Sequence, residues 1–571
     1  MAKRVIYSIF VEPEFDEKKA GLNLNFFSKY EKRLTDVKKN YAKKVGADWK
    51  IFKSLKKVEQ FQKKFSIDTI YNAVNLYKLY MFEELSKKYD EVLYLDFDVV
   101  PNTEENFFEE VDLSKGIWAL DQNDRINERL WIQHRDSRDP TLKYLHAKAL
   151  TGKEHSTINT AILGGDSENI ARCAFMSRLK GYIHSTNTKK GCNKYGISNE
   201  VNHNNEAFFS AAVVDSGVAI QNEDRLWHVR LDDASVIDQR TKEKFDLETQ
   251  FRDAKFLHFI NKNFGEYFED VRKVVYSMNI VIPKELNDPA GTYFDDKIDK
   301  TERTTIEFAK WSDRLIANKK AYAQKIGADF IHFERDEKYE AFREDCKRVV
   351  PDMSEYNIVN FYKIWLAYYL VDEGYDQVLY LDHDVVVNTP ISFFAAFNLE
   401  MAICCNYASE LRDEATERVL ALPRTHPENF VYNFRGHDAK YWNCHALLEE
   451  DGEDGKNDVY NTGILGASRA TLEKLDYFSN FEELLETMTF LKEDDLTMYP
   501  PQVQKSFGYD NETVFSYRVQ SNQVPVYNLD TQYWHYKIDH EHTGKKETVL
   551  EDDPAFMHVI NKDFKLVDHA L

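Results

Sequence analysis

Long apolar runs are scarce in this sequence, and its basic residues are outnumbered by acidic ones. Its 571 residues hold 75 lysines and arginines against 97 aspartates and glutamates, which gives a formal net charge of −22. A surface of this sign repels phosphate backbones, so the composition disfavours nucleic acid as a partner. We find no apolar run of about 18 residues, and therefore expect no membrane span.

Cysteines are also few, and they show neither a disulfide framework nor a zinc-binding spacing. The six stand at Cys173, Cys192, Cys346, Cys404, Cys405 and Cys444. This distribution is typical of reduced thiols in a cytosolic chain. The segment MAKRVIYSIFVEPEFDEK at the start has an apolar run too short for a signal peptide. We therefore expect a cytoplasmic protein.

What the sequence does contain is a repeat. Residues 92–103 read VLYLDFDVVPNT, and residues 378–389 read VLYLDHDVVVNT. Each is an apolar run that ends in two aspartates separated by one residue. The two runs stand about half the chain apart, which indicates a duplication of something the size of a domain.

The repeat extends well beyond the aspartates, in the same order in both halves. The pairs are Arg4–Ser8 with Lys273–Ser277, YNAVNLYK (71–78) with YNIVNFYK (356–363), NTAILGG (159–165) with NTGILGA (461–467), NEAFFS (205–210) with NETVFS (511–516), and HFINKNF (258–264) with HVINKDF (558–564). Loop lengths change between the copies while the order is kept, as expected of two copies of one fold.

Strand patterns alternate with helical patterns such as residues 76–89 and 361–375. This order predicts an α/β fold: two tandem Rossmann-like domains, each with a mainly parallel sheet, at residues 1–268 and 269–571. Buried parallel strands read as continuous apolar runs and bind ligands at their carboxyl ends. Asp96 and Asp98 should point the same way and converge on one cation.

The ordered motifs resemble those of the GT-A nucleotide-sugar glycosyltransferases, and within them the glycogenin-like family 8. The resemblance covers nearly the whole chain, twice. It implies a divalent cation, Mn²⁺ or Mg²⁺, and a nucleotide-sugar donor, with UDP-sugars expected, because a cation stabilises the diphosphate leaving group. The implied metal ligands are Asp98 and His258 in the first copy and Asp384 and His558 in the second, while Asp96 and Asp382 reach the metal or the donor ribose.

The resemblance also implies residues that bind the donor. They are Lys78, Asn159 and Lys262 in the first copy, and Lys363, Asn461 and Lys562 in the second. Simpler interpretations stay open: strand-end carboxylates that cap the next element, a core histidine, a solvated helix lysine, and turns at the neighbouring glycines. Lys262 and Lys562 stand closer to the histidine than the family pattern has them, which leaves their phosphate-binding role open.

The catalytic candidates are Glu206 and Glu512, each preceded by an asparagine, Asn205 or Asn511. A glutamate that faces the acceptor hydroxyl could be the general base of an inverting reaction. The glycogenin-like pattern has Asp-Gln here, and that family retains the anomeric configuration. We favour retention.

The sequence therefore predicts a bifunctional glycosyltransferase that acts on a glycan or protein acceptor. Residues 124–138 and 406–419 differ between the copies and are candidate acceptor regions. The Trp-His pairs at Trp227 and Trp534 fit buried packing better than sugar stacking. One alternative is a single active domain beside a sugar-binding pseudoenzyme. Another is nucleotidyl transfer, but residues 8–15 lack the glycine-rich basic signature it needs.

Overall fold

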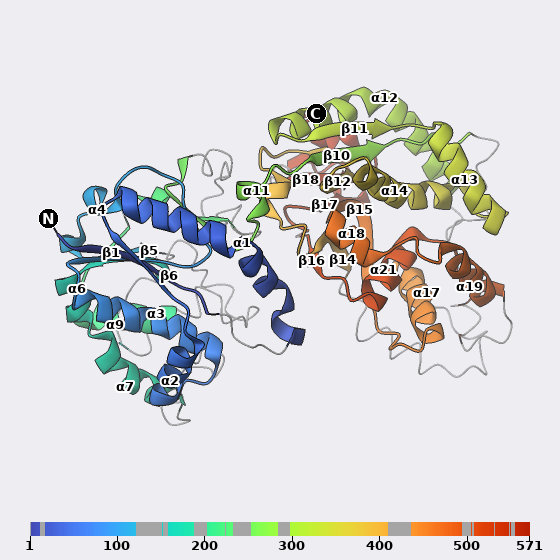
Figure 1. Cartoon of the computed structure of the whole chain (residues 1–571). Coiled ribbons are helices and arrows are strands. Elements are labelled where there is room, and N and C mark those ends of the chain that lie inside the picture. Colours follow the sequence, from blue (N-terminus) through green and yellow to red (C-terminus); the bar gives the residue numbers. More distant parts are fainter. Residues whose placement is uncertain are drawn as a thin grey trace. The chain divides into compact units, whose positions relative to one another are not determined.

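Two six-stranded sheets with the same strand order form the framework of the chain. The first belongs to a compact unit at Met1–Glu269, called unit 1, and the second to Asp270–Leu571, called unit 2 (Figure 1). The computed structural model describes residues 2–11, 17–121, 151, 158–187, 203–222, 224–231, 253–283, 297–408, 436–493, 499, 504, 507–529, 531–547, 549 and 554–571.

The main sheet of unit 1 has the order β2-β1-β3-β6-β5-β7. Its strands are β1 (Arg4–Ile9), β2 (Asp48–Phe52), β3 (Glu91–Leu95), β5 (Ile117–Asp121), β6 (Ile158–Asp166) and β7 (Ile220–Gln221). β1 runs parallel to β2 and β3, and β5 runs parallel to β7, while β6 is antiparallel to both of its neighbours. A small second sheet has the order β4-β9-β8, with β4 (Val99–Pro101), β8 (Val229–Leu231) and β9 (Phe256–Phe259).

Unit 2 repeats this topology strand for strand, with the orders β11-β10-β12-β15-β14-β16 and β13-β18-β17. The main strands are β10 (Lys273–Met278), β11 (Asp329–Phe333), β12 (Gln377–Leu381), β14 (Ile403–Ala408), β15 (Val459–Ser468) and β16 (Val526–Asn528). The small sheet contains β13 (Val385–Val387), β17 (Tyr536–Ile538) and β18 (Phe556–Val559). The predicted α/β class with a mainly parallel sheet is confirmed in both units.

Helices cover both faces of each sheet. In unit 1 they are α1 (Glu17–Lys44), α2 (Leu55–Phe65), α3 (Ile70–Ser86), α4 (Phe107–Glu110), α6 (Ser167–Cys173), α7 (Phe175–Asn187), α9 (Asn205–Ser216) and α11 (Gly265–Phe268), with 3-10 turns at Leu113–Lys115 and Arg225–His228. In unit 2 they are α12 (Lys297–Lys325), α13 (Glu337–Val349), α14 (Glu355–Asp372), α15 (Phe393–Ala396), α17 (Gly436–Glu450), α18 (Arg469–Leu475), α19 (Phe481–Glu493) and α21 (Asn511–Ser521), with 3-10 turns at His540–His542 and Phe564–Val567.

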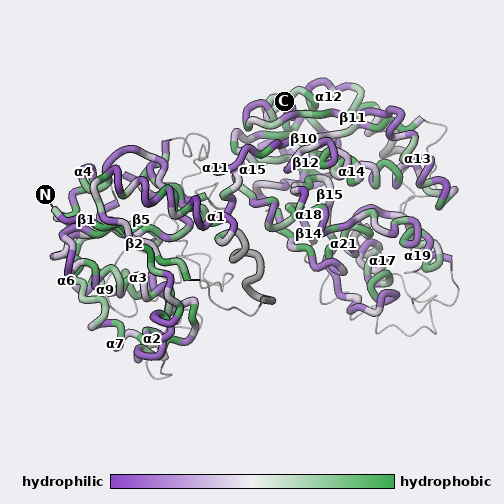
Figure 2. Tube along the Cα trace, in the orientation of Figure 1, coloured by the Kyte–Doolittle hydropathy of each residue, from purple (hydrophilic) through white to green (hydrophobic). Residues whose placement is uncertain are grey.

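The alternation of side chains along β1 explains these layers. Val5 and Tyr7 pack into the core beneath α2 and α3, whereas Ile6 faces the opposite core with Tyr41 and Val45 of α1. Figure 1 shows α1 and α3 on opposite faces of the sheet. In unit 2, Figure 2 shows hydrophilic and hydrophobic residues alternating along α12, the pattern of a helix with one buried face.

Two expectations on residue chemistry can be compared with the described part of the chain. None of its helices is long and apolar enough to cross a membrane. Its cysteines, Cys173, Cys346, Cys404, Cys405 and Cys444, are buried free thiols, in line with the predicted reduced state.

Candidate metal and donor site

The two aspartates of each repeat stand in the turn that follows the third strand of the sheet. In unit 1, β3 ends at Leu95, and the Asp96 N–H donates to the Ala161 carbonyl of β6 at 2.7 Å. The Val99 N–H donates to the Asp96 carbonyl at 3.0 Å and closes the turn before β4. Asp98 is therefore buried at the edge of the sheet, where parallel strands bind ligands.

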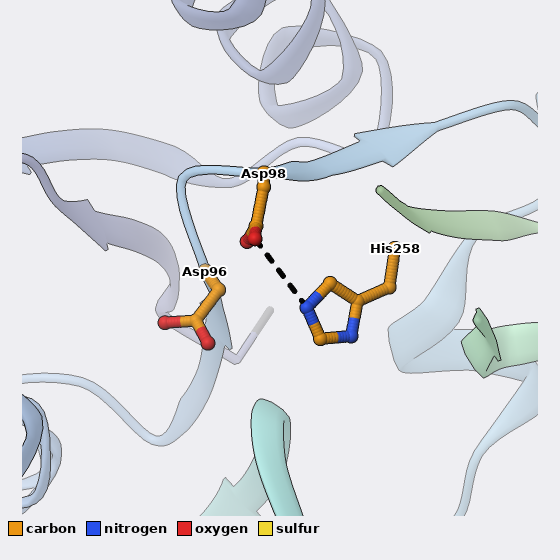
Figure 3. Close-up of side chains that lie close together, drawn as sticks. All are labelled: Asp96, Asp98 and His258. Carbon is orange, nitrogen blue, oxygen red and sulfur yellow. Dashed lines mark ion pairs between the residues drawn. The ribbon is translucent and has the colours of Figure 1, made fainter. Parts of the chain in front are cut away.

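The small sheet brings the late histidine to these carboxylates. β4 pairs with β9 so that Val99 lies opposite His258, directly beside Asp98. The His258 Nε2 atom lies 3.6 Å from an Asp98 carboxylate oxygen (Figure 3). Asp96, Asp98 and His258 each offer a ligand atom within 4.8 Å of the others. This donor set fits a divalent cation that accepts oxygen and imidazole ligands.

Unit 2 builds the same set from Asp382, Asp384 and His558. The His558 Nε2 atom lies 3.4 Å from an Asp384 oxygen and 3.8 Å from an Asp382 oxygen. β13 and β18 pair with Val385 opposite His558, which matches the register in unit 1. The two histidines predicted from sequence are therefore brought to the aspartates rather than left in a distant core.

A lysine from the loop after β9 or β18 contacts the buried aspartate in each unit. The Lys262 ammonium group forms an ion pair with Asp98, and Lys562 does so with Asp384. Both lysines adopt a left-handed backbone conformation, with φ of 57° and 59°, which non-glycine residues rarely adopt. Burial raises the pKa of Asp98, but Lys262 and His258 outweigh burial and hold it well below its usual range. The site therefore already favours positive charge at this carboxylate.

A second lysine approaches the other aspartate from the preceding helix. Lys78 of α3 is buried, and its Nζ atom lies 3.4 Å from an Asp96 oxygen. Lys363 of α14 is 3.9 Å from Asp382. Each helix begins at a side-chain cap, Thr69 or Ser354, which places the lysine two turns further along on the site side. The solvated-lysine interpretation is thereby excluded.

The catalytic candidates bind the backbone of the strand beside the aspartate turn, which is β6 in unit 1 and β15 in unit 2. The Glu206 carboxylate accepts from the Thr160 N–H at 3.3 Å, and Glu512 accepts from Thr462 N–H at 2.9 Å. The preceding asparagines donate from Nδ2 to the threonine hydroxyls, at 2.5 Å for Asn205 and 2.8 Å for Asn511. The residue after each threonine accepts, at its carbonyl, the N–H of the first aspartate in the turn. The glutamates therefore lie close to the aspartate carboxylates.

Glu512 has an additional partner, Lys440 of α17, which forms an ion pair with its second oxygen. Burial raises the pKa of Glu512, but Lys440 and Lys363 outweigh burial and lower it to about 2. Sequence reasoning missed Lys440, because it stands in a region that the repeat does not align. The predicted acceptor segment 124–138 lies outside the described residues, as does most of 406–419.

The interpretation of the neighbouring glycines as turns is wrong. Residues 159–165 and 461–467 lie within the continuous strands β6 and β15. Gly164 and Gly466 instead allow close packing, since an added Cβ would lie 2.7 Å from Phe107 and 2.4 Å from Phe393. Only Gly463 faces the metal set, where a Cβ would meet His558 at 2.6 Å and Asp382 at 2.8 Å.

Asn159 and Asn461 lie in these strands rather than at the head of a loop. Their Oδ1 atoms accept from the N–H groups of Ala161 at 2.9 Å and Gly463 at 3.0 Å. The Asn461 Oδ1 atom would lie 3.1 Å from a Cβ at Gly463, and so stands next to the metal set. The predicted position beside the donor sugar stays a prediction.

A second histidine contacts the candidate metal-binding histidine in each unit, and the sequence analysis gave neither of these second histidines a role. His228 and His258 share a hydrogen bond of 3.0 Å between Nε2 and Nδ1, as do His535 and His558. The adjacent Trp227 and Trp534 are buried in the core, as expected. A partner at Nδ1 fixes the orientation of a metal-binding imidazole, so His228 and His535 hold the candidate ligands His258 and His558 in place.

Comparison with known proteins bears on unit 2 first. Residues 293–499 match the family model described as Glycosyl transferase family 8. Unit 2 therefore carries a glycosyltransferase domain. No curated protein matches the sequence. The family match does not extend to unit 1, whose likeness to unit 2 consists of the repeated motifs and the shared strand order.

Solved glycosyltransferase structures resemble the chain at low identity. One is a glycosyltransferase involved in the glycosylation of the major capsid of PBCV-1, with 13% identity, a TM-score of 0.26, and coverage of 52% of this chain and 99% of that chain. Mouse xyloside xylosyltransferase 1 has 11% identity and a TM-score of 0.27, with coverage of 46% of this chain and 98% of that chain. The WbbM bifunctional glycosyltransferase has 9% identity and a TM-score of 0.23, with coverage of 84% of this chain and 83% of that chain.

Proposed function

We propose that the chain is a bifunctional, metal-dependent glycosyltransferase. Each unit would move a sugar from a nucleotide-sugar, with UDP-sugars as the expected donors, to a glycan or protein acceptor. The observation that carries this proposal is the duplicated Asp/Asp/His set, with a buried lysine on one side of it and a partly buried lysine on the other in both units.

Asp96, Asp98 and His258 would hold the cation in unit 1, and Asp382, Asp384 and His558 in unit 2. The donor set of two carboxylates and one imidazole suits Mn²⁺, and carboxylates also suit Mg²⁺. A divalent cation there would neutralise the charge that develops on the leaving diphosphate.

The lysines at the edge of the set would bind the donor phosphates directly. Lys78 and Lys262 in unit 1, and Lys363 and Lys562 in unit 2, each place an ammonium group at a metal-binding carboxylate. An ammonium group is a point charge that pairs well with phosphate oxygens. With a cation on the carboxylates, these four groups would be released to the diphosphate.

We further propose that the reaction in unit 2 retains the anomeric configuration. An inverting general base works best with a pKa near the operating pH. Glu512 has a pKa of about 2, because Lys440 and Lys363 outweigh its burial, and both its oxygens have partners in the protein. It is better suited to stabilise positive charge at the anomeric carbon as a permanent carboxylate than to accept a proton.

A second candidate function is one active domain beside a sugar-binding domain. Two observations favour it: the family model matches unit 2 alone, and unit 1 has Ala161 where unit 2 has Gly463 against the metal set. In that case unit 1 would bind a donor or a glycan without turnover.

The test is nucleotide release from a panel of UDP- and GDP-sugars with Mn²⁺, which compares the wild type with Asp98→Ala and Asp384→Ala. We expect each variant to lose turnover of a different donor. A silent Asp98→Ala beside an inactive Asp384→Ala would support the second candidate instead. A wild-type chain that bound none of the donors would contradict both.

A further inference from the structure

Unit 1 has a cavity of ≈ 590 Å³ that lies away from the metal set, over the edge strand β2 and between α2 and α3. This volume is within the usual range for small-ligand sites. Helix α3 separates the two sites, because Lys78 faces Asp96 while its neighbours Tyr77 and Tyr80 line the cavity.

The cavity is strongly basic, although the chain as a whole carries a net charge of −22. Five lysines line it against a single glutamate: Lys3, Lys50, Lys57, Lys64 and Lys88. Within the described part of the chain, none of the five ammonium groups forms an ion pair. Glu84 is already neutralised by Lys87, which lies outside the lining.

Aromatic rings lie among the lysines. Phe61 contacts Tyr77 and Tyr80, with ring centroids 5.4 Å apart in both cases. The Lys3 and Lys50 ammonium groups lie over the ring of Tyr89, at 4.9 Å and 5.7 Å from its centroid. Rings offer flat faces to the apolar side of a sugar, and ammonium groups offer partners to its acidic substituents.

Unit 2 has the aromatic residues of this region but fewer of its positive charges. Phe342, Tyr362 and Trp365 form the same three-ring cluster. The strand register places Ile331 at the position of Lys50, since Tyr7 pairs with Lys50 and Tyr276 pairs with Ile331.

Two of the other basic positions change in unit 2, whereas Lys338 keeps the charge of Lys57 and pairs with Asp336. Asp345, before the buried Cys346, corresponds to Lys64, before the buried Phe65. Gly374 corresponds to Lys88, and the Arg272 guanidinium, at the position of Lys3, donates to the carbonyls of Glu373 and Gly374 at 3.3 Å and 3.1 Å. Three of the five lysines are therefore particular to unit 1 and are no requirement of the shared fold.

We propose that this cavity binds a short saccharide chain that carries carboxylate or phosphate groups. The unpaired lysines favour an anionic ligand, the rings accept sugar faces, and the volume admits a few sugar rings. The acidic remainder of the chain repels an extended nucleic acid. The inference relies on the proposed function only for the choice of a saccharide, because an enzyme that extends glycans gains from a site that holds them outside the donor site.

The test is binding of hexagalacturonate, and of a glucose oligomer of equal length that bears phosphate esters, measured by calorimetry on the full chain. Lys57→Glu/Lys64→Glu reverses two charges that line the cavity. Lys56→Glu/Lys63→Glu makes the same change on the same helix at exposed positions outside the lining. We expect the first pair to weaken binding by about tenfold or more, and the second by less than about twofold.

The two acidic oligomers show whether carboxylate or phosphate is preferred, and either result supports the site. Equal weakening by both pairs would overturn it, since the attraction would then be diffuse. So would equal binding of neutral maltohexaose, tighter binding of oligothymidylate, or no binding at all. Nucleotide release without acceptor should stay unchanged in both pairs, so failure of this site can be told from failure of the catalytic proposal.

Discussion

At the scale of single residues, the two metal sets differ at one position of the strand beside them. Unit 2 has Gly463, and unit 1 has Ala161 at the equivalent point of β6. The His558 Nε2 atom approaches both Asp382 and Asp384, at 3.8 Å and 3.4 Å. The Gly463 backbone leaves the space that this arrangement needs, since a Cβ there would lie 2.6 Å from His558.

Gly463→Ala should therefore weaken Mn²⁺ binding in unit 2. The added methyl group pushes His558 and Asp382 apart, and changes around metal ligands of this kind cost about 10–100-fold in affinity. A Mn²⁺ titration of nucleotide release in the Asp98→Ala background measures it. Ala161→Gly is the matched control and should leave unit 2 unchanged. Unaltered Mn²⁺ affinity in Gly463→Ala would contradict this account.

Lys440 sets the charge of Glu512, and this gives a prediction about pH. Burial raises the pKa of Glu512, and Lys440 with Lys363 lowers it to about 2. The carboxylate thus stabilises the fold above its unfolded pKa and loses that contribution as pH falls towards 2. In Lys440→Met burial is less opposed, so the pKa rises.

We expect the acid limb of unit 2 turnover in Lys440→Met to move to higher pH. The pH profile of nucleotide release in the Asp98→Ala background measures this shift. Lys440→Arg keeps the positive charge and should keep the wild-type limb. If Lys440→Met also kept it, the ionised Glu512 would have no part in turnover.

At the scale of secondary-structure elements, α1 and α12 each place one fully buried lysine against an aspartate turn. The Lys38 Nζ atom donates to the Phe97 carbonyl at 2.8 Å, and Lys319 donates to the His383 carbonyl at 3.0 Å. Each carbonyl belongs to the residue between the two aspartates. Burial lowers the pKa of Lys319 to about 7, although Asp384 and Asp382 oppose it.

Lys319→Met should change how stability depends on pH. The pKa of Lys319 in the folded protein, about 7, lies below the ordinary lysine pKa of about 10.5, so wild-type stability falls as pH drops from about 10.5 to about 7. The variant lacks this loss. Its free energy of unfolding relative to wild type should therefore rise by about 1.4 kcal/mol for each unit by which the pH falls within that window. Urea unfolding at several pH values tests this, with the exposed Lys320→Met as control. A stability difference independent of pH would disprove the lowered pKa of Lys319.

These elements also show what sequence could predict. The aspartate strands, the late histidines and Lys78 stand next to apolar runs or within repeated motifs, so local pattern and order were enough to find them. Lys38 and Lys319 are repeated too, but a lysine in a long charged helix has the pattern of a solvated residue. Only the crossing of the helix over the aspartate turn buries it, and that crossing is a property of the folded sheet.

At the scale of the whole molecule, each unit has its own hydrophobic cores and its own metal and donor constellation. The units share a strand order but differ in the charge over the α2 and α13 helices, at Gly463, and at their loops. If both candidate sites bind a donor, the chain combines two similar sites with different surroundings, which is the arrangement we expect of two successive or distinct transfers.

The central claim is that there are two independent donor sites, and the stoichiometry of UDP binding with Mn²⁺ tests it most directly. Calorimetry should give two sites per wild-type chain, one in Asp98→Ala, one in Asp384→Ala, and none in the double variant. A wild-type chain with a single site, or loss of all binding on either single substitution, would contradict the account.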